Sequence, residues 1–471
     1  MMNSKKIASY AVGPIGASIL GFITLPIITW FYSVEDVGRI SMLQVFTSFS
    51  VLIFCLGLDQ AYIREYHSTT NKSLLLKTTL LPGVILSLIL FIIIYLYDST
   101  IISKWLYKIP STYLSIITIL CFVAALISRF LSLVIRMQER ALAFSMSQLL
   151  PKLLFLLIIL TSVWFDFSKD TYNLITVNVL SIFFVFFIFL WNTRQDWIVS
   201  FRYKIEKEKL HKLFSFGLPL VIGGLASWGL NVMDKLFLRT LSSYTELGIY
   251  SVAMSIAAVA AILSGIFNTI WAPMVYKWES ENSVDISKID SISEVVLAIV
   301  YFVIVLSGLF SWVIPYLLPK QYEIIQFLIT CCLIGPLFYT LSETTAVGIT
   351  LARKTKLSML ASIGAMLINL IGNYILVSRF GAMGATAATA IAFWSFFILR
   401  TEFSKLAWRK IPVLKSYICV TVLTFSALTG MFFLSQNLIA FICLWLALLF
   451  IGFFIFMKTI KRLMMQMRIG F

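Results

Sequence analysis

The stretch LLPGVILSLILFIIIYLY (residues 80–97) carries no charged side chain. An α-helix rises about 1.5 Å per residue, so this stretch spans about 27 Å, close to the ~30 Å thickness of the hydrocarbon core of a bilayer. Apolar and polar residues do not alternate along it, as they do in the strands of membrane barrels. The stretch therefore predicts a helix that crosses a membrane.

Stretches of the same kind fill almost the whole chain. Of its 471 residues, 60% are hydrophobic and 12% are charged, which is about half the charged fraction of a soluble domain. The mean hydropathy is +0.96. We predict an all-α, polytopic membrane protein with about 14 transmembrane helices and no room for a soluble domain. The predicted spans are residues 11–31, 40–58, 80–97, 112–134, 141–165, 173–191, 213–238, 247–270, 294–316, 324–350, 357–377, 383–399, 416–434 and 437–457.

The positive charge is distributed unevenly between the connectors. The chain has 37 Lys and Arg against 21 Asp and Glu, a net charge of +16. If the N-terminus lies in the cytoplasm, most of the Lys and Arg residues fall in connectors on that side. This is the positive-inside pattern, and it predicts that both termini are cytoplasmic. The charge thus reports topology, and we expect no nucleic-acid partner.

The longest polar connector, about residues 192–212, separates the sixth predicted span from the seventh. We take it as the boundary between two six-helix bundles. The prediction is an N-terminal bundle over residues 1–200, a C-terminal bundle over residues 201–410, and two additional transmembrane helices over residues 411–471.

The two predicted bundles share some sequence features. The first span opens with Val12-Gly13-Pro14, and the seventh opens with Phe216-Gly217-Leu218-Pro219. A short connector with an acid and a glycine follows each span, with Glu35 in the first bundle and Glu246 in the second. Because both spans start on the same side, the bundles are predicted to be parallel repeats about an axis along the membrane normal.

Three cations fall inside predicted spans, and one of these, Lys235, lies at the outer end of the seventh span. Each costs about 2.5–3.5 kcal/mol at the centre of a membrane on insertion scales, so such a residue usually faces a cavity or a partner. Lys152 lies near the middle of the fifth span, beside Pro151. It is interpreted as a cavity-lining cation, with a buried ion pair as the alternative. Arg129 lies toward the inner end of the fourth span, where it either faces a cavity or extends to the interface.

Other ionisable residues lie at or within the ends of spans. Asp59 and Arg64 are at the inner end of the second span, and Arg353 follows the tenth. Asp234 lies late in the seventh span and Glu343 within the tenth. The carboxylates Asp59, Asp234 and Glu343 are candidates for binding a coupling ion, a proton or sodium ion. Because the deep charges are more often positive than negative, they favour an anionic substrate such as a phosphate or pyrophosphate head group.

Several chemistries have no motif in this sequence. It contains no GxxxxGK[ST] loop for ATP, and no HExxH, GxSxG or aspartate-rich metal motif. The six cysteines fall within apolar spans without metal-ligand spacing, and both histidines, His67 and His211, lie on inner connectors. We therefore expect no cofactor, no metal site and no enzymatic activity.

Motifs at several positions together resemble those of one superfamily. They are Gly57-Leu58-Asp59-Gln60-Ala61-Tyr62-Ile63-Arg64, Phe216-Gly217-Leu218-Pro219, Asp234, Gly248-Ile249-Tyr250 and Gly381-Ala382-Met383-Gly384-Ala385. In their order and spacing, over about the first 410 residues, the chain resembles the oligosaccharide flippases (O-antigen translocases, Wzx-like) of the multidrug/oligosaccharidyl-lipid/polysaccharide exporter superfamily. The two extra C-terminal spans resemble those of fourteen-span lipid II flippases.

The resemblance implies a bacterial inner-membrane protein that works by alternating access around a central cavity. Its implied cargo is an undecaprenyl-pyrophosphate-linked oligosaccharide, moved from the inner to the outer leaflet, with cation coupling and a possible polysaccharide polymerase complex as partner. Arg64, Arg129, Lys152 and Arg353 would then hold the pyrophosphate. The alternatives are a cation-coupled multidrug antiporter, a lipid II flippase, and a membrane enzyme such as a polymerase or acyltransferase, which the short outer loops disfavour.

Overall fold

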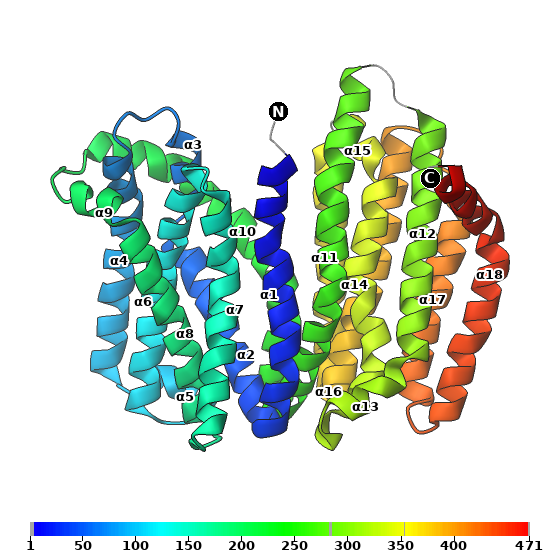
Figure 1. Ribbon diagram of the computed structural model, residues 1–471, viewed down its shortest axis with the longest axis horizontal. Helices are drawn as coiled ribbons and strands as arrows, with labels where there is room; N and C mark the ends of the chain where they lie inside the picture. The colour runs from blue at the N-terminus through cyan, green and yellow to red at the C-terminus, as the bar shows by residue number, and fades with distance from the viewer. Residues whose placement is uncertain (1–3, 282–284, 353, 470–471) are drawn as a thin grey trace. The chain divides into compact units, whose positions relative to one another are not determined.

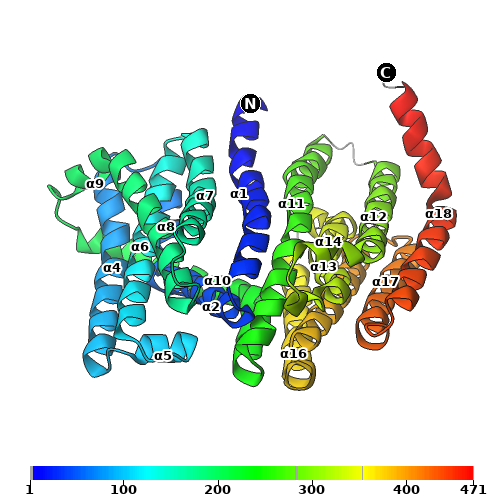
Figure 2. The same cartoon turned by 60° about the horizontal axis from the view of Figure 1, so that its bottom comes forward.

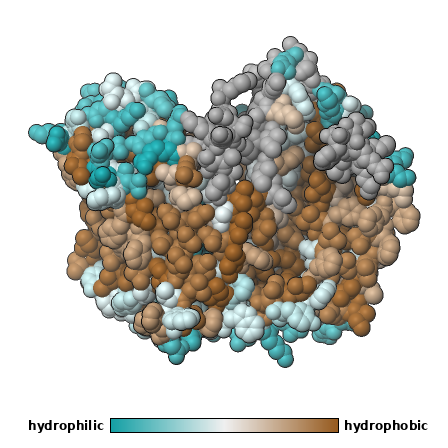
Figure 3. Space-filling view, in the orientation of Figure 1, coloured by the Kyte–Doolittle hydropathy of each residue, from teal (hydrophilic) through white to brown (hydrophobic). Residues whose placement is uncertain are grey.

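The computed structural model describes residues 4–281, 285–352 and 354–469, and over these residues all regular secondary structure is helical (Figure 1). Within this part of the chain, 12 helices are long and apolar enough to cross a membrane. Figure 3 shows apolar residues across the middle of the visible face and polar ones toward its top and bottom. The prediction of an all-α, polytopic membrane protein is confirmed.

One of the 12 candidate spans, Lys356–Ala407, contains two of the fourteen predicted spans. They meet at Gly381, whose φ of 51° and ψ of −126° are not helical, so two helices join there. Another predicted span, 213–238, lies in helix α10 (Lys207–Leu241), which is not among the 12 helices found over the described residues. The count of fourteen therefore remains a prediction.

The chain forms two compact units, Met1–Val232 and Met233–Phe471, so the division falls inside α10. The three predicted segments with boundaries at 200 and 410 remain a prediction. Unit 1 contains the first part of α10 and the helices α1 (Ser4–Phe31), α2 (Val34–Phe54), α3 (Leu58–Glu65), α4 (Lys72–Tyr97), α5 (Ile101–Tyr107), α6 (Thr112–Met137), α7 (Ala141–Trp164), α8 (Thr171–Asn192) and α9 (Arg194–Ser200). Unit 2 contains the rest of α10, α11 (Tyr244–Ser280), α12 (Ile286–Leu309), η1 (Ser311–Val313), α13 (Ile314–Leu317), η2 (Lys320–Tyr322), α14 (Ile325–Thr345), α15 (Val347–Leu351), α16 (Thr355–Ala407), α17 (Leu414–Phe433) and α18 (Leu438–Ile469).

Unit 1 is held together by apolar packing of α1 against α7 and of α7 against α8 (Figure 1). Tyr32, Phe155 and Leu174 belong to one buried cluster at this junction. The Tyr32 hydroxyl donates a hydrogen bond of 2.6 Å to Asn173 Oδ1, so the polar tip of this buried ring is satisfied. The short helix α5 lies across the end of α6 (Figure 2).

In unit 2, α17 and α18 are integrated with the rest of the unit. Helix α18 packs on α12, where the Tyr301 hydroxyl donates 2.8 Å to the Leu448 carbonyl. A side chain on Gly308 would collide with the Trp445 ring, which shows how closely the two helices approach. Lys415 at the start of α17 pairs with Glu294 of α12 at 2.7 Å.

The two units repeat one structural device. In unit 1, Asp36 in the first turn of α2 accepts a hydrogen bond from the hydroxyl of Thr171, the first residue of α8. In unit 2, Glu246 in the first turn of α11 accepts 2.7 Å from the backbone N–H of Ala382, just after the Gly381 bend. In each unit a carboxylate thus accepts a hydrogen bond at the start of a later helix, which is the sixth predicted span of its own bundle. This shared arrangement favours the predicted internal repeat.

Candidate functional site

Unit 1 contains an open cavity of about 710 Å³ among α2, α3, α6, α7 and α8. Its polar wall consists of hydroxyl, amide and charged side chains: Gln44, Thr47, Ser48, Asp59, Ser128, Arg129, Ser132, Ser147, Gln148, Lys152, Asn178 and Ser181. Such side chains are rare inside membrane helices unless they face a cavity or one another. The cavity brings together three predicted site residues, Asp59, Arg129 and Lys152.

Lys152 lies on α7 one position after Pro151, and its side chain is exposed to the cavity. Over the described residues it makes no ion pair, so its charge is available to a ligand. The Ser128 hydroxyl on the same wall is buried and has no hydrogen-bond partner in the described part of the chain. The wall thus offers an ammonium group to whatever enters, and the unsatisfied hydroxyl lies just beneath its surface.

Arg129 on α6 forms an ion pair with Asp59 on α3, with 2.9 Å between Nη2 and Oδ2. The Asp59 side chain is 12% exposed and the Arg129 side chain 40%, so the carboxylate is sheltered while the guanidinium still reaches the cavity. From the sequence the two residues have separate predicted roles, Arg129 as a substrate ligand and Asp59 as an ion-coupling candidate. The structure joins them in one pair.

Asp234, in unit 2, lies at the centre of a different network. Its carboxylate is buried, and it accepts hydrogen bonds from Tyr250 Oη (2.5 Å), Thr389 Oγ1 (2.7 Å), Asn373 Nδ2 (2.6 Å) and Asn369 Nδ2 (3.2 Å). All four donors are neutral, and Asp234 makes no ion pair with any described residue. A buried carboxylate without a counter-charge is costly unless it binds a cation or a proton.

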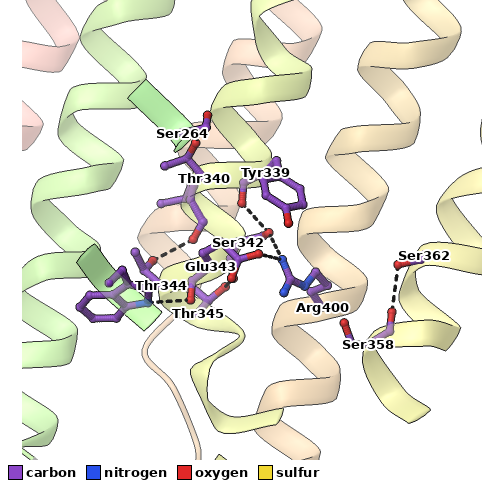
Figure 4. A network of polar contacts seen from close by, with 12 residues as sticks. Ser264, Tyr339, Thr340, Ser342, Glu343, Thr344, Thr345, Ser358, Ser362 and Arg400 are labelled. Carbon is purple, nitrogen blue, oxygen red and sulfur yellow. Dashed lines mark hydrogen bonds and ion pairs between the residues drawn. The ribbon is translucent and has the colours of Figure 1, made fainter. Parts of the chain in front are cut away.

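Glu343 on α14 is paired, in contrast to Asp234. Arg400 of α16 donates to Glu343 Oε1 at 2.8 Å and to Ser342 Oγ at 2.7 Å (Figure 4). The guanidinium also lies over the rings of Tyr339 and Phe396. Because Arg400 already compensates its charge, Glu343 is less suited than Asp234 to bind a coupling cation.

Arg64 does not line the unit 1 cavity. Its guanidinium lies 4.3 Å from the centre of the Phe216 ring, in a smaller pocket with Lys209 and Lys212. Arg353, the remaining predicted pyrophosphate ligand, lies outside the described residues. The roles of all these side chains stay predictions.

The donors around Asp234 and the partner of Glu343 are not among the site residues predicted from the sequence. Asn369 and Asn373 are spaced by four positions within an apolar stretch, so their spacing would have indicated a shared polar helix face. Arg400 falls one position past the predicted twelfth span and was therefore counted as a connector residue. No group of three or more potential metal ligands occurs among the residues that the structure describes.

Comparison with known proteins identifies the family. Residues 4–278, more than half of the chain, match the family described as "Polysaccharide biosynthesis protein". The chain belongs to this family. Protein 1 of the Lsg locus of Haemophilus influenzae is 22% identical over 324 residues, which cover 65% of this chain and 73% of that protein.

Two solved structures show the same fold. The lipid II flippase MurJ, in an inward closed conformation, matches with a TM-score of 0.64 and 16% identity, over 94% of this chain and 98% of MurJ. An inward-facing multidrug resistance MATE family transporter of the MOP superfamily matches with a TM-score of 0.56 and 13% identity, over 83% and 94% of the two chains. This member of the polysaccharide biosynthesis family is therefore a multi-pass membrane protein, and its fold is similar to that of these two transporters.

Proposed function

We propose that the protein is a flippase for a lipid-linked oligosaccharide whose head group carries a pyrophosphate. It moves this cargo from the inner to the outer leaflet of the bacterial plasma membrane by alternating access, with fourteen spans and both termini in the cytoplasm. The observation that carries the proposal is the polar cavity of unit 1, with Lys152 unpaired on its wall. A cation in a low-dielectric cavity attracts an anionic ligand, and hydroxyl and amide groups suit sugars.

In this mechanism Lys152 binds the pyrophosphate, and Arg129 joins it when the phosphate competes with Asp59. The Ser128 hydroxyl supplies a further donor to the phosphate oxygens or the first sugar. The lipid tail stays in the bilayer, where it needs no polar contact. Arg64 lies in another pocket and is not required by this cavity.

Asp234 is the proposed coupling residue. Its buried, unpaired carboxylate accepts only neutral donors, so a proton or a sodium ion would neutralise it. Binding of this ion in unit 2 would favour one conformation of the transport cycle, and its release the other.

The direct test is a leaflet-exchange assay with the full chain reconstituted in vesicles. The substrate is a fluorescent pyrophosphate-linked polyprenyl oligosaccharide, and the Lys152→Glu variant should lose exchange at least about 100-fold, since it replaces an attraction with a repulsion of several kcal/mol. The matched control is Lys104→Glu on α5, which makes the same charge change at an exposed residue outside the cavity. Wild-type exchange by Lys152→Glu would refute the assignment, and efflux of a cationic dye by the wild type would favour the multidrug antiporter.

A further inference from the structure

A second pocket in unit 1 is distinct from the cavity. It has a volume of about 250 Å³ and lies between α3, the beginning of α4 and the beginning of α10. Three cations line it, Arg64, Lys209 and Lys212, against one carboxylate, Glu65. The local charge is therefore positive, and it lies on the side that the positive-inside pattern makes cytoplasmic.

The Arg64 guanidinium is held in place by stacking, and its N–H groups remain available as hydrogen-bond donors. It stacks over the Phe216 ring at 4.3 Å, and its Nε is 3.7 Å from Glu65 Oε1, too far for a hydrogen bond. The side chain is 59% exposed. Stacking fixes the plane of the guanidinium and leaves its N–H edge for an oxyanion, which is the geometry that arginine offers to phosphate.

The two lysines complete a basic face on α10. Lys209 and Lys212 are three positions apart, so they lie on the same side of the helix. Lys209 forms an ion pair with Glu206, with 3.3 Å between Nζ and Oε2. Lys212 makes no ion pair within the described ranges. Both side chains are exposed toward solvent as well as lining the pocket.

The other wall of the pocket is apolar. It consists of Leu74, Leu75, Leu213 and Phe216. Leu74 and Leu75 belong to the first turns of a candidate membrane span, Lys72–Tyr97. The pocket thus combines a basic face with an apolar wall at the level where a membrane helix begins, which is where lipid phosphates lie.

We propose that this pocket binds a phosphate-bearing head group at the cytoplasmic membrane surface. Its volume is below the ~300–1,000 Å³ of pockets that hold drug-sized ligands, so it fits a phosphate or diphosphate group and excludes an oligosaccharide. Arg64, Lys209 and Lys212 supply the donors, and the leucines contact the first carbons of an attached lipid. The proposal does not depend on the cargo of the unit 1 cavity.

The test measures equilibrium binding to the full chain in a neutral detergent. The probes are dihexanoyl phosphatidylglycerol, inorganic pyrophosphate and, for comparison, zwitterionic dihexanoyl phosphatidylcholine. Every protein carries Lys152→Gln, so that binding in the cavity is weakened and contributes equally to all variants. The test variant is Lys209→Glu with Lys212→Glu, and the matched control is Lys204→Glu with Lys207→Glu, which makes the same charge change in the same exposed connector outside the pocket.

A cation near an anionic lipid contributes about fivefold to binding, so reversing two should weaken phosphatidylglycerol binding at least about tenfold more than in the control. An equal loss for pyrophosphate would show that the phosphate alone is recognised, and a loss confined to the lipid would show that the apolar wall contributes. Equal weakening in test and control, or equal affinity for the zwitterionic lipid, would overturn the proposal. The milder Lys209→Gln with Lys212→Gln pair decides the same question if the reversed variant does not fold.

Discussion

Replacing Gly57 by alanine should destabilise unit 1 strongly. Gly57 precedes α3 with φ 70° and ψ 2°, a left-handed conformation that costs an L-residue about 1–2 kcal/mol. A Cβ atom there would lie 2.0 Å from the backbone oxygen of Gly217 and 2.4 Å from its carbonyl carbon, both in α10. Backbone atoms cannot rotate away, so the crowding adds about 1–3 kcal/mol.

Together the two costs amount to about 2–5 kcal/mol. For a unit of this size, 1 kcal/mol shifts the melting temperature by about 2–4 °C, so we expect a decrease of roughly 4–20 °C. The assay is thermal unfolding of the purified chain in detergent, followed by tryptophan fluorescence. The matched control is Gly223→Ala in α10, where nothing lies within 4 Å of an added Cβ.

The control should be neutral or more stable, because alanine favours a helix over glycine by about 1 kcal/mol. A melting temperature of Gly57→Ala within about 1 °C of the wild type would refute the reasoning. It would mean that α3 does not approach α10 as closely as the Gly57–Gly217 contact requires.

Three further variants test the polar networks. Asp234→Ala removes the acceptor of four buried donors, so it should lower the free energy of unfolding by at least about 3 kcal/mol. Asp234→Asn should lower it by less. Equal melting temperatures of the two variants would contradict this expectation. Arg400→Met leaves Glu343 with an uncompensated charge and should lower the free energy of unfolding by about 3–5 kcal/mol. Adding Glu343→Gln should recover part of the lost thermal stability. If it recovers none, the ion pair between Arg400 and Glu343 does not stabilise the protein. Glu246→Ala removes the charge-assisted bond to the Ala382 N–H and should cost about 1.5–3 kcal/mol in the same unfolding assay, whereas an unchanged midpoint would show that the bond is dispensable.

The membrane helices could be predicted because hydropathy over a stretch of span length reports a property of each segment alone. The place of Lys152 near the middle of α7 could be predicted for the same reason, since a helix converts sequence position into height along its axis. Its exposure to a cavity was a hypothesis that follows from the cost of burying an unpaired charge. The structure places the side chain on such a wall.

Pairing between helices could not be predicted. Asp59 and Arg129 are 70 positions apart, and nothing in the spacing indicates that α3 brings the carboxylate to α6. Arg64 lies on the same short helix, and its five-residue offset from Asp59 places it on another face, toward Phe216. The short helix α3 thus contributes Asp59 to the cavity and Arg64 to the smaller pocket. Only the packing of the neighbouring helices decides which residue reaches which of the two sites.

Helix α10 has a consequence for dividing this protein into fragments. The boundary between the compact units falls within the helix. A break in the polar connector before it would deprive one fragment of Phe216 and Gly217, the partners of Arg64 and Gly57. A break after the helix would instead separate Asp234 from Asn373. Either break therefore leaves a fragment without packing or hydrogen-bonding partners that only the other fragment supplies, so each fragment should be less stable alone than within the intact chain.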